Sequence, residues 1–344
     1  MSTIPECRSA GLRVMDLTSF PQEETFYVST MDRVVLSDAL QGRDDDAISK
    51  LSSGNSEMHE VSIDPVELKG MYRVDSHANH CLKLVDDKNF AMEFYEPTME
   101  VDLGTQLFSA NMSMDGKFLG AGGADGAFHV IHVPTAQRVA LQGHVGDITT
   151  IEFFPSSVVA LTGSTDFRLR IWSMESFKCA AVLQRHTSAI TGVGILGRGR
   201  NITSCAADGK VLLWNVGTSE QLSTWSLASS ATCMAIWNNA LPLIGNEVNT
   251  KHPLESETEG KVLFVGTEHH GVQGIDVRST EPITKLNAPS SVTSCALYPA
   301  VENSILVGCE NGIVSTYDLR RTAAPLTMVS RSSAAVHGFY PKSN

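Results

Sequence analysis

An internal repeat of 42 residues is the feature that most restricts how this 344-residue chain can fold. A His, a Thr or Ser, an Asp and a Trp occur in one segment and recur in the same order, each 42 residues further on. They are His144, Thr162, Asp166 and Trp172 in the first segment and His186, Ser204, Asp208 and Trp214 in the second. Four positions that shift together by one period indicate an array in which each repeat is one structural unit packed against its neighbours.

The same frame continues more weakly on both sides of these two repeats. The Trp position falls on Ile131 in the preceding unit, and on Ile275 and Tyr317 in the following ones, with steps of 41, 42, 61 and 42 residues. The 61-residue step is explained by an insertion at 238–260, whose Pro, Asn, Gly and Glu content predicts a surface loop between two strands.

Each repeat is predicted to contain four short strands. Segments such as ITTIEF, VVALT, FRLRIW and CAAVL have the length and β-branched content of strands. Asp125-Gly126, Asp208-Gly209 and Asn311-Gly312 separate the second and third strands and suit tight hairpins. Four antiparallel strands per repeat predict an all-β, WD40-type β-propeller with five blades. A sixth blade is expected to begin with AAVHGFY (334–340) as its first strand, which leaves the propeller C-terminally incomplete.

The repeated polar residues have a structural explanation. The Asp of the hairpin can accept a hydrogen bond from the His, the His can meet the Thr or Ser hydroxyl, and the hydroxyl can accept from the indole N–H of the Trp. Such a buried network is favourable only when every member is paired. Only the two repeats named first have the full set, so the other blades must depend on apolar packing.

The chain divides by character near residue 100. Residues 101–344 form the predicted propeller, and residues 1–100 form an N-terminal β-rich extension in which no repeat register is found. The polar stretch at 41–57 is expected to be disordered. The extension could be a separate small β domain, or it could supply strands to the ring.

Composition excludes several classes of partner. A net charge of −12 disfavours nucleic acid and membranes and favours basic protein surfaces. The seven cysteines are widely spaced and contain no C-x-x-C pair, so neither a disulfide framework nor a zinc site is expected. The N-terminus lacks the apolar run of a signal peptide, and an intracellular protein of the cytoplasm and nucleus is expected.

No segment predicts an active site. The run LGAGGADG (119–126) lacks the Lys and Ser/Thr of a phosphate-binding loop and coincides with a hairpin of the repeat. A metal site at Asp75, His77, His80 and Cys81 is disfavoured because no second ligand cluster follows. The combination of His, Asp and Ser or Thr superficially suggests a hydrolase triad, but a catalytic set would not be copied at every repeat. We therefore expect a protein that is not an enzyme and has no cofactor, metal or small-molecule substrate.

Residues 141–183, together with GRGRNITSCAADGKVLLWNVGTSEQL, the insertion at 238–260 and NGIVSTYDLRRTAAP, resemble the proteasomal ATPase-associated factor family. The resemblance covers roughly 103–329, and members of that family continue for more blades. It implies a chaperone that assembles the base of the 26S proteasome regulatory particle by binding the C-terminal domains of proteasomal ATPase subunits. The family has no catalytic residues.

A set of charged loop residues is the predicted binding surface. The loop before each first strand and the hairpin between the second and third strands open on the same side of a propeller. We therefore expect the candidate partner-binding residues to gather there beside His144. They are Asp147, Arg185, Glu268 and Glu310.

Two alternatives remain open. Ile275-Asp276-Val277-Arg278 and Tyr317-Asp318-Leu319-Arg320 resemble the W-D-x-R box of WD40 substrate receptors of cullin-type ubiquitin ligases. The simpler explanation is that Asp and Arg end the third strand and pair locally. A generic WD40 scaffold with another partner is the second alternative.

Overall fold

The computed structural model of the chain describes residues 101–237, 252–269, 271–279, 282–297, 303–330 and 334–339 in full, and before them the backbone of six strands. The chain divides into two compact units, Met1–Val34 with Asp44–Gly104 and Val35–Arg43 with Thr105–Asn344. Within the described residues, no helix is long and apolar enough to cross a membrane.

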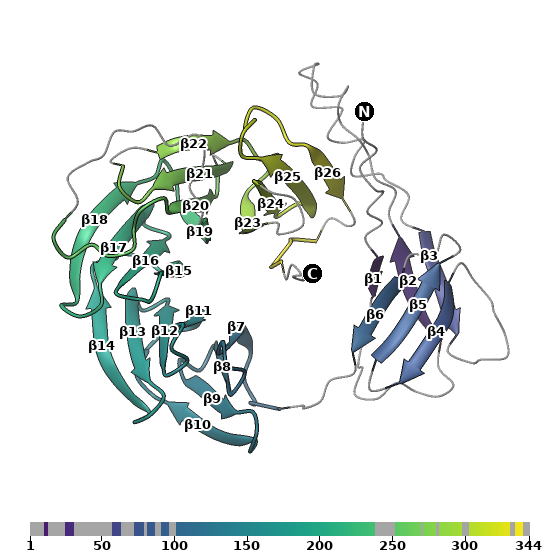
Figure 1. Cartoon of the computed structure of the whole chain (residues 1–344), viewed down its shortest axis with the longest axis horizontal. Helices are drawn as coiled ribbons and strands as arrows, with labels where there is room; N and C mark the ends of the chain where they lie inside the picture. Colours follow the sequence, from purple (N-terminus) through teal and green to yellow (C-terminus); the bar gives the residue numbers. More distant parts are fainter. Residues whose placement is uncertain are drawn as a thin grey trace. The chain divides into compact units, whose positions relative to one another are not determined.

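The first unit contains two antiparallel sheets of three strands (Figure 1). One sheet has the order β1-β2-β3 and the other the order β4-β5-β6. The strands are β1 (Ala10–Leu12), β2 (Thr25–Thr30), β3 (Glu57–Ser62), β4 (Tyr72–Ala78), β5 (Cys81–Asp86) and β6 (Ala91–Tyr95). Among the described strands, no sheet of this unit contains a strand of the second unit. The stretch expected to be disordered, 41–57, lies outside the described residues except for Glu57, which begins β3.

The second unit consists of five antiparallel sheets of four strands each, which follow one another along an arc (Figure 1). Each sheet is one blade, and the prediction of an all-β, WD40-type propeller is confirmed.

The strands of the blades are listed in chain order. Blade 1 has β7 (Leu107–Met112), β8 (Phe118–Gly123), β9 (Phe128–His132) and β10 (Gln137–Leu141), and blade 2 has β11 (Ile148–Phe153), β12 (Val159–Ser164), β13 (Arg168–Ser173) and β14 (Lys178–Gln184). Blade 3 has β15 (Ile190–Leu196), β16 (Asn201–Ala206), β17 (Lys210–Asn215) and β18 (Glu220–Ser226), and blade 4 has β19 (Ala231–Trp237), β20 (Val262–Thr267), β21 (Gly271–Asp276) and β22 (Pro282–Leu286). Blade 5 has β23 (Val292–Leu297), β24 (Ser304–Cys309), β25 (Ile313–Asp318) and β26 (Thr327–Ser330).

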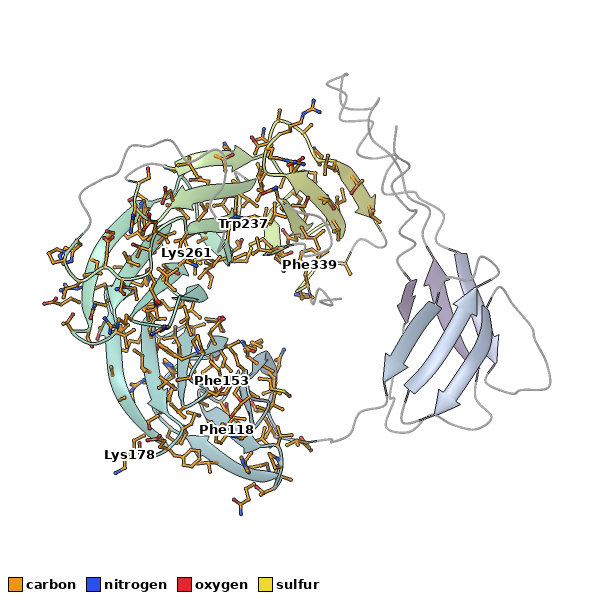
Figure 2. All side chains as sticks on the ribbon, in the orientation of Figure 1. Phe118, Phe153, Lys178, Trp237, Lys261 and Phe339 are labelled. Atoms are coloured by element: carbon orange, nitrogen blue, oxygen red, sulfur yellow. The ribbon has the colours of Figure 1, made fainter. Side chains whose placement is uncertain are left out.

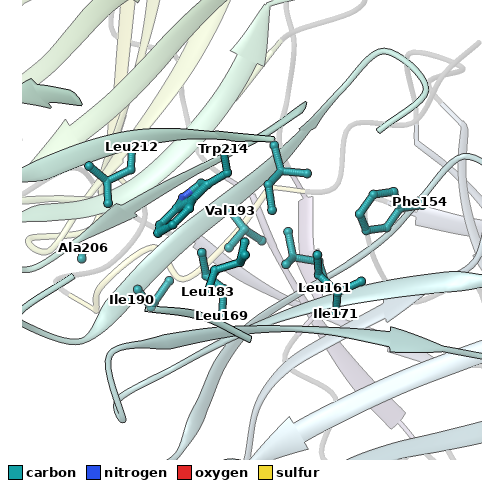
Figure 3. Packing of buried hydrophobic residues seen from close by; sticks show 11 residues of the cluster. Phe154, Leu161, Leu169, Ile171, Leu183, Ile190, Val193, Ala206, Leu212 and Trp214 are labelled. Atoms are coloured by element: carbon teal, nitrogen blue, oxygen red, sulfur yellow. The ribbon is translucent and has the colours of Figure 1, made fainter. Parts of the chain in front are cut away.

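The core of the second unit lies between successive blades. Leu161, Leu169 and Leu183 of blade 2 pack against Ile190 and Trp214 of blade 3 in one cluster of buried side chains (Figure 3). A second cluster joins blades 3 and 4, and a third joins blades 1 and 2. Blades 2, 3 and 4 each have a neighbouring blade on both faces, and their middle strands are almost continuously buried, as in KVLLWN and VLFVGT.

The hairpins between the second and third strands have the backbone that the sequence predicts. Gly126, Gly209 and Gly312 have φ angles of 68°, 71° and 79°, which side chains disfavour. In blade 2 the equivalent residue is Phe167, which also has a positive φ angle, of 68°.

The insertion in blade 4 joins β19 to β20, as the 61-residue step predicts. Its residues 238–251 lie outside the described part of the chain, whereas 252–260 pack on blade 3. The side-chain amides of Asn201 and Asn215 both donate to the carbonyl oxygen of Leu254, at 3.3 and 3.1 Å, and Ser256 N–H donates to Asn201 Oδ1. The insertion therefore ties blade 4 to blade 3 near the start of β16.

The expectation of a strand at 334–340 is corrected by the structure. Residues 334–339 lie against the inner side of blade 5 but do not form a strand (Figure 2). Thr293 Oγ1 donates to the carbonyl oxygen of Val336 at 2.7 Å, just as Thr149 Oγ1 donates to Ile190 at 2.6 Å where blade 2 meets blade 3. Val336 thus occupies the place of the first residue of a following blade. The segment is held by the Thr293 side chain and by a hydrogen bond from Val336 N–H to the carbonyl oxygen of Cys309, and it has no strand ladder.

Candidate functional site

The four polar residues of blade 2 form one continuous hydrogen-bonded chain. Trp172 Nε1 donates to Thr162 Oγ1 at 2.8 Å, and that oxygen lies 2.8 Å from His144 Nε2. His144 Nδ1 lies 2.9 Å from Asp166 Oδ2. With the ring proton of His144 on Nδ1, the Thr hydroxyl donates to Nε2 and every member of the chain is paired. The network joins the C-terminal end of β13 to the loop before β11 through the Thr162 hydroxyl of β12.

Blade 3 repeats this arrangement. Trp214 Nε1 donates to Ser204 Oγ at 2.9 Å, and Ser204 Oγ lies 2.8 Å from His186 Nε2. His186 Nδ1 lies 3.0 Å from Asp208 Oδ2, which also accepts from Thr187 N–H at 2.9 Å. The network therefore holds the loop before β15 against the hairpin between β16 and β17.

Burial sets the charge state of these groups. Desolvation lowers the pKa of His144 and of His186 below the ordinary value, although the neighbouring Asp acts in the opposite direction. Desolvation also acts to raise the pKa of Asp166, but hydrogen bonds from His144 and from two backbone N–H groups outweigh it and leave this pKa lowered. Near neutral pH, each pair therefore consists of an uncharged His and an ionised Asp, which suits a structural network.

The other blades replace this network by apolar contacts. The position of Thr162 and Ser204 is taken by Val265 in β20 and by Val307 in β24, both fully buried. At the Trp position of blade 5, the Tyr317 hydroxyl donates to the carbonyl oxygen of Asn287 in the preceding loop. Blades 4 and 5 therefore have no hydroxyl at this position that could carry the polar chain.

The predicted binding residues lie on one side of the arc, which we name the network rim. It consists of the loops before the first strands and the hairpins between the second and third strands of blades 2 to 5. Thr165 N–H donates to Asp147 O at 2.9 Å, and the N–H groups of Glu268 and Glu310 make the same bond to Ser230 and Ser291 in their own blades, at 3.1 and 2.9 Å. Glu268, Glu310 and Arg185 are exposed, and Asp147 is half-buried.

Two apolar residues of the network rim were missed by the sequence reasoning. Val145 is 86% exposed and follows His144, and Phe167 is 43% exposed at the tip of the blade 2 hairpin. The sequence did contain a signal for Phe167, because blade 2 has an aromatic residue at the hairpin position where three other blades have Gly. Together with Asp147, these side chains make the blade 2 part of the rim an apolar surface beside an acidic one, which is a composition suited to protein contacts.

The opposite side of the arc has a hollow that is lined in part by a half-buried acid, Glu152. A cavity of about 570 Å³ is lined by Met112, Met114, Glu152, Phe153 and Lys261, among others. Burial raises the pKa of Glu152 to about 7. The sequence reasoning did not single out this residue, because one Glu in a strand has no distinctive spacing.

No metal centre is found among the described side chains, since none of their His, Cys, Asp and Glu residues gather in groups of three or more that could hold an ion. The side chains of Asp75, His77, His80 and Cys81 lie outside the described residues.

The two Asp-x-Arg segments differ in their contacts. In blade 5, Arg320 Nη2 lies 2.8 Å from Asp318 Oδ2, so the two residues pair locally. In blade 4, the guanidinium of Arg278 instead contacts Glu259 Oε2 at 3.5 Å, and Asp276 Oδ1 accepts from the Arg278 backbone N–H. Local pairing thus accounts for the Arg of blade 5 without a partner protein.

Comparison with known families matches the central blades. The WD domain, G-beta repeat model matches residues 135–173 and 177–215, which include both complete networks. These two segments are WD40 repeats.

Curated relatives of the chain belong to several cellular systems. It is 31% identical over 201 residues to the 26S proteasome regulatory subunit RPN14 of Saccharomyces cerevisiae, a match that covers 55% of this chain and 47% of that protein. It is 35% identical over 88 residues to pre-mRNA-processing factor 19 of Mus musculus, covering 25% of this chain and 18% of that protein. It is 28% identical over 192 residues to the U3 snoRNP-associated protein-like EMB2271 of Arabidopsis thaliana, covering 55% of this chain and 40% of that protein. The chain spans less than half the length of each of these relatives. For this chain, the matches support a WD40 scaffold that binds protein.

Proposed function

We propose that this chain is a non-catalytic assembly chaperone of the 26S proteasome regulatory particle, which acts in the cytoplasm and nucleus by binding the C-terminal domains of proteasomal ATPase subunits. The observation that carries the proposal is the 31% identity to a proteasome regulatory subunit over 201 residues. The stretch of the chain that resembles the proteasomal ATPase-associated factor family also contains both complete networks.

The network rim is the surface proposed to receive the ATPase domain. Its carboxylates at Asp147, Glu268 and Glu310 suit a basic partner, and Val145 and Phe167 add apolar area beside them. Exposed charge pairs contribute only about 0.2–1 kcal/mol each, so several must act together and they mainly set association rate and specificity.

The test is a binding assay with separately purified ATPase C-terminal domains. Reversal of the three acids (Asp147→Lys, Glu268→Lys and Glu310→Lys) is expected to weaken binding by about 3- to 100-fold at low salt, to flatten its salt dependence and to leave Tm unchanged.

A matched control variant distinguishes the effect of the rim positions on binding from the effect of net charge alone. Glu175, Glu220 and Glu259 are exposed acids outside the network rim, and their reversal to Lys changes the net charge by the same amount. Equal loss of binding in both triple variants would contradict the rim assignment, and no binding of any ATPase domain by the wild-type chain would contradict the function. Co-purification of a ligase adaptor in place of ATPase subunits would favour the ubiquitin-ligase receptor.

A further inference from the structure

The innermost strands of blades 4 and 5, β19 and β23, lie side by side (Figure 1). Two thiols meet between these strands. Cys233 lies in β19 and Cys295 in β23, and their Sγ atoms are 3.5 Å apart. The two residues are 62 positions apart in the sequence, so only the packing of the blades brings them together. As whole residues, Cys233 and Cys295 are half-buried, whereas Cys205 and Cys309 are buried.

The surrounding residues leave room for this contact. Gly266 in β20 lies opposite Cys233, and a Cβ atom there would come within 2.5 Å of Cys233 Sγ and 2.7 Å of Val292 Cγ1. Any side chain at this position would push the thiol away. The thiol of Cys295 lies 3.6 Å from the carbonyl oxygen of Phe264 in the same strand, β20. The two sulfur atoms are therefore held over one strand of blade 4.

We propose that Cys233 and Cys295 are a redox modification site, which hydrogen peroxide converts into a disulfide bond between blades 4 and 5. Disulfide formation requires the two sulfur atoms to approach from 3.5 Å to about 2.05 Å.

The two thiols have different roles in the reaction. The hydrogen bond with Cys295 lowers the pKa of Cys233, whereas that same bond and desolvation raise the pKa of Cys295 well above its usual value. Cys233 is therefore the attacking thiolate. Its sulfur forms a bond to one peroxide oxygen, the O–O bond breaks, and the departing hydroxide takes up a proton to become water. Cys295 sulfur then attacks the sulfenic acid at Cys233, the S–O bond breaks, and a second water leaves with the thiol proton. In total, two thiols and one peroxide give one disulfide and two waters.

The expected consequence is a covalent link between successive blades. The disulfide would close a loop from 233 to 295, which includes the insertion, and would restrict the unfolded chain. We expect the oxidised protein to have a Tm higher by roughly 5–10 °C, and reduction to reverse the rise.

The experiment uses the full chain treated with hydrogen peroxide, then alkylated, digested without reductant and analysed by mass spectrometry. We expect a peptide pair joined through Cys233 and Cys295, which disappears after dithiothreitol. The Cys233→Ser variant should give no such pair and should leave Cys295 free to alkylate, whereas the matched Cys179→Ser variant should give the pair unchanged.

Two results would overturn the proposal without depending on any variant. One is full alkylation of both Cys233 and Cys295 in wild-type protein after peroxide treatment. The other is a disulfide map in which Cys233 is joined to Cys205 or to several cysteines in similar amounts. Neither result would bear on the proposed binding of ATPase subunits.

Discussion

Replacing Thr162 by Val removes one hydroxyl group and leaves the shape of the side chain almost unchanged. The site accepts a valine sterically, because Val265 and Val307 occupy the equivalent buried positions of blades 4 and 5. The substitution therefore tests the polar network of blade 2 rather than its packing.

The magnitude follows from the groups that lose a partner. Thr162 is fully buried, and its hydroxyl serves both Trp172 Nε1 and His144 Nε2. A buried polar group left unpaired costs about 1–3 kcal/mol, so we expect Thr162→Val to lower the free energy of unfolding by about 2–5 kcal/mol. Urea denaturation followed by circular dichroism measures this loss, with an unchanged m value.

Thr203→Val is the matched control. Thr203 is also fully buried, but its hydroxyl makes only long contacts, at 3.4 Å to the carbonyl oxygen of Gly194 and 3.8 Å to Met234 Sδ. Its loss should be under about 1 kcal/mol. Equal losses for Thr162→Val and Thr203→Val would refute the network argument.

A double-mutant cycle gives a second check. Trp172→Phe removes the indole N–H that Thr162 accepts, so Thr162→Val should cost about 1 kcal/mol less in that background than in the wild type. Strict additivity would mean that the 2.8 Å contact between Trp172 and Thr162 contributes nothing to stability.

The remaining predictions concern stability and pH. Trp214→Ala should lower the free energy of unfolding by about 3–5 kcal/mol, because it leaves a cavity and unpairs Ser204; an unchanged thermal melt would contradict the assignment of β17. Glu152 has a raised pKa, so its contribution to stability is present below pH 4.5 and is lost as pH rises through about 7. The free energy of unfolding of Glu152→Gln should therefore rise relative to that of the wild type by up to about 3 kcal/mol between pH 4.5 and pH 8.5. His144 and His186 have lowered pKa values, so in the Glu152→Gln background Tm should fall as pH drops below 6.5, and a rise in Tm over that range would contradict the neutral state of both rings.

Much of the propeller could be predicted because its repeat is a local pattern. The positions of Trp172 and Trp214 fix the third strands of two blades, and Asp-Gly and Asn-Gly pairs fix three of the hairpins. The His, Asp, hydroxyl and Trp residues of each network come from one repeat, so the spacing alone indicates that they can meet.

The places where prediction failed depend on contacts between distant segments. The segment 334–339 was expected to be a strand, but it is held by Thr293 and Cys309 from the side. Phe167 has the local sequence of a hairpin tip, and its exposure follows only from the fold. The burial that raises the pKa of Glu152 arises from loops of several blades that meet around it.

The sequence by itself determined the blade: the strand lengths, the turns and the polar chain within each of the two WD40 repeats. These features depend on residues within about 42 positions of one another, where side-chain type and spacing decide the local structure. Only the tertiary structure decided which side chains meet across blades, such as Cys233 with Cys295, and that Val145 and Phe167 are exposed on the network rim. Such contacts depend on the angle and register at which one sheet packs on the next, and no short-range pattern in the sequence encodes them.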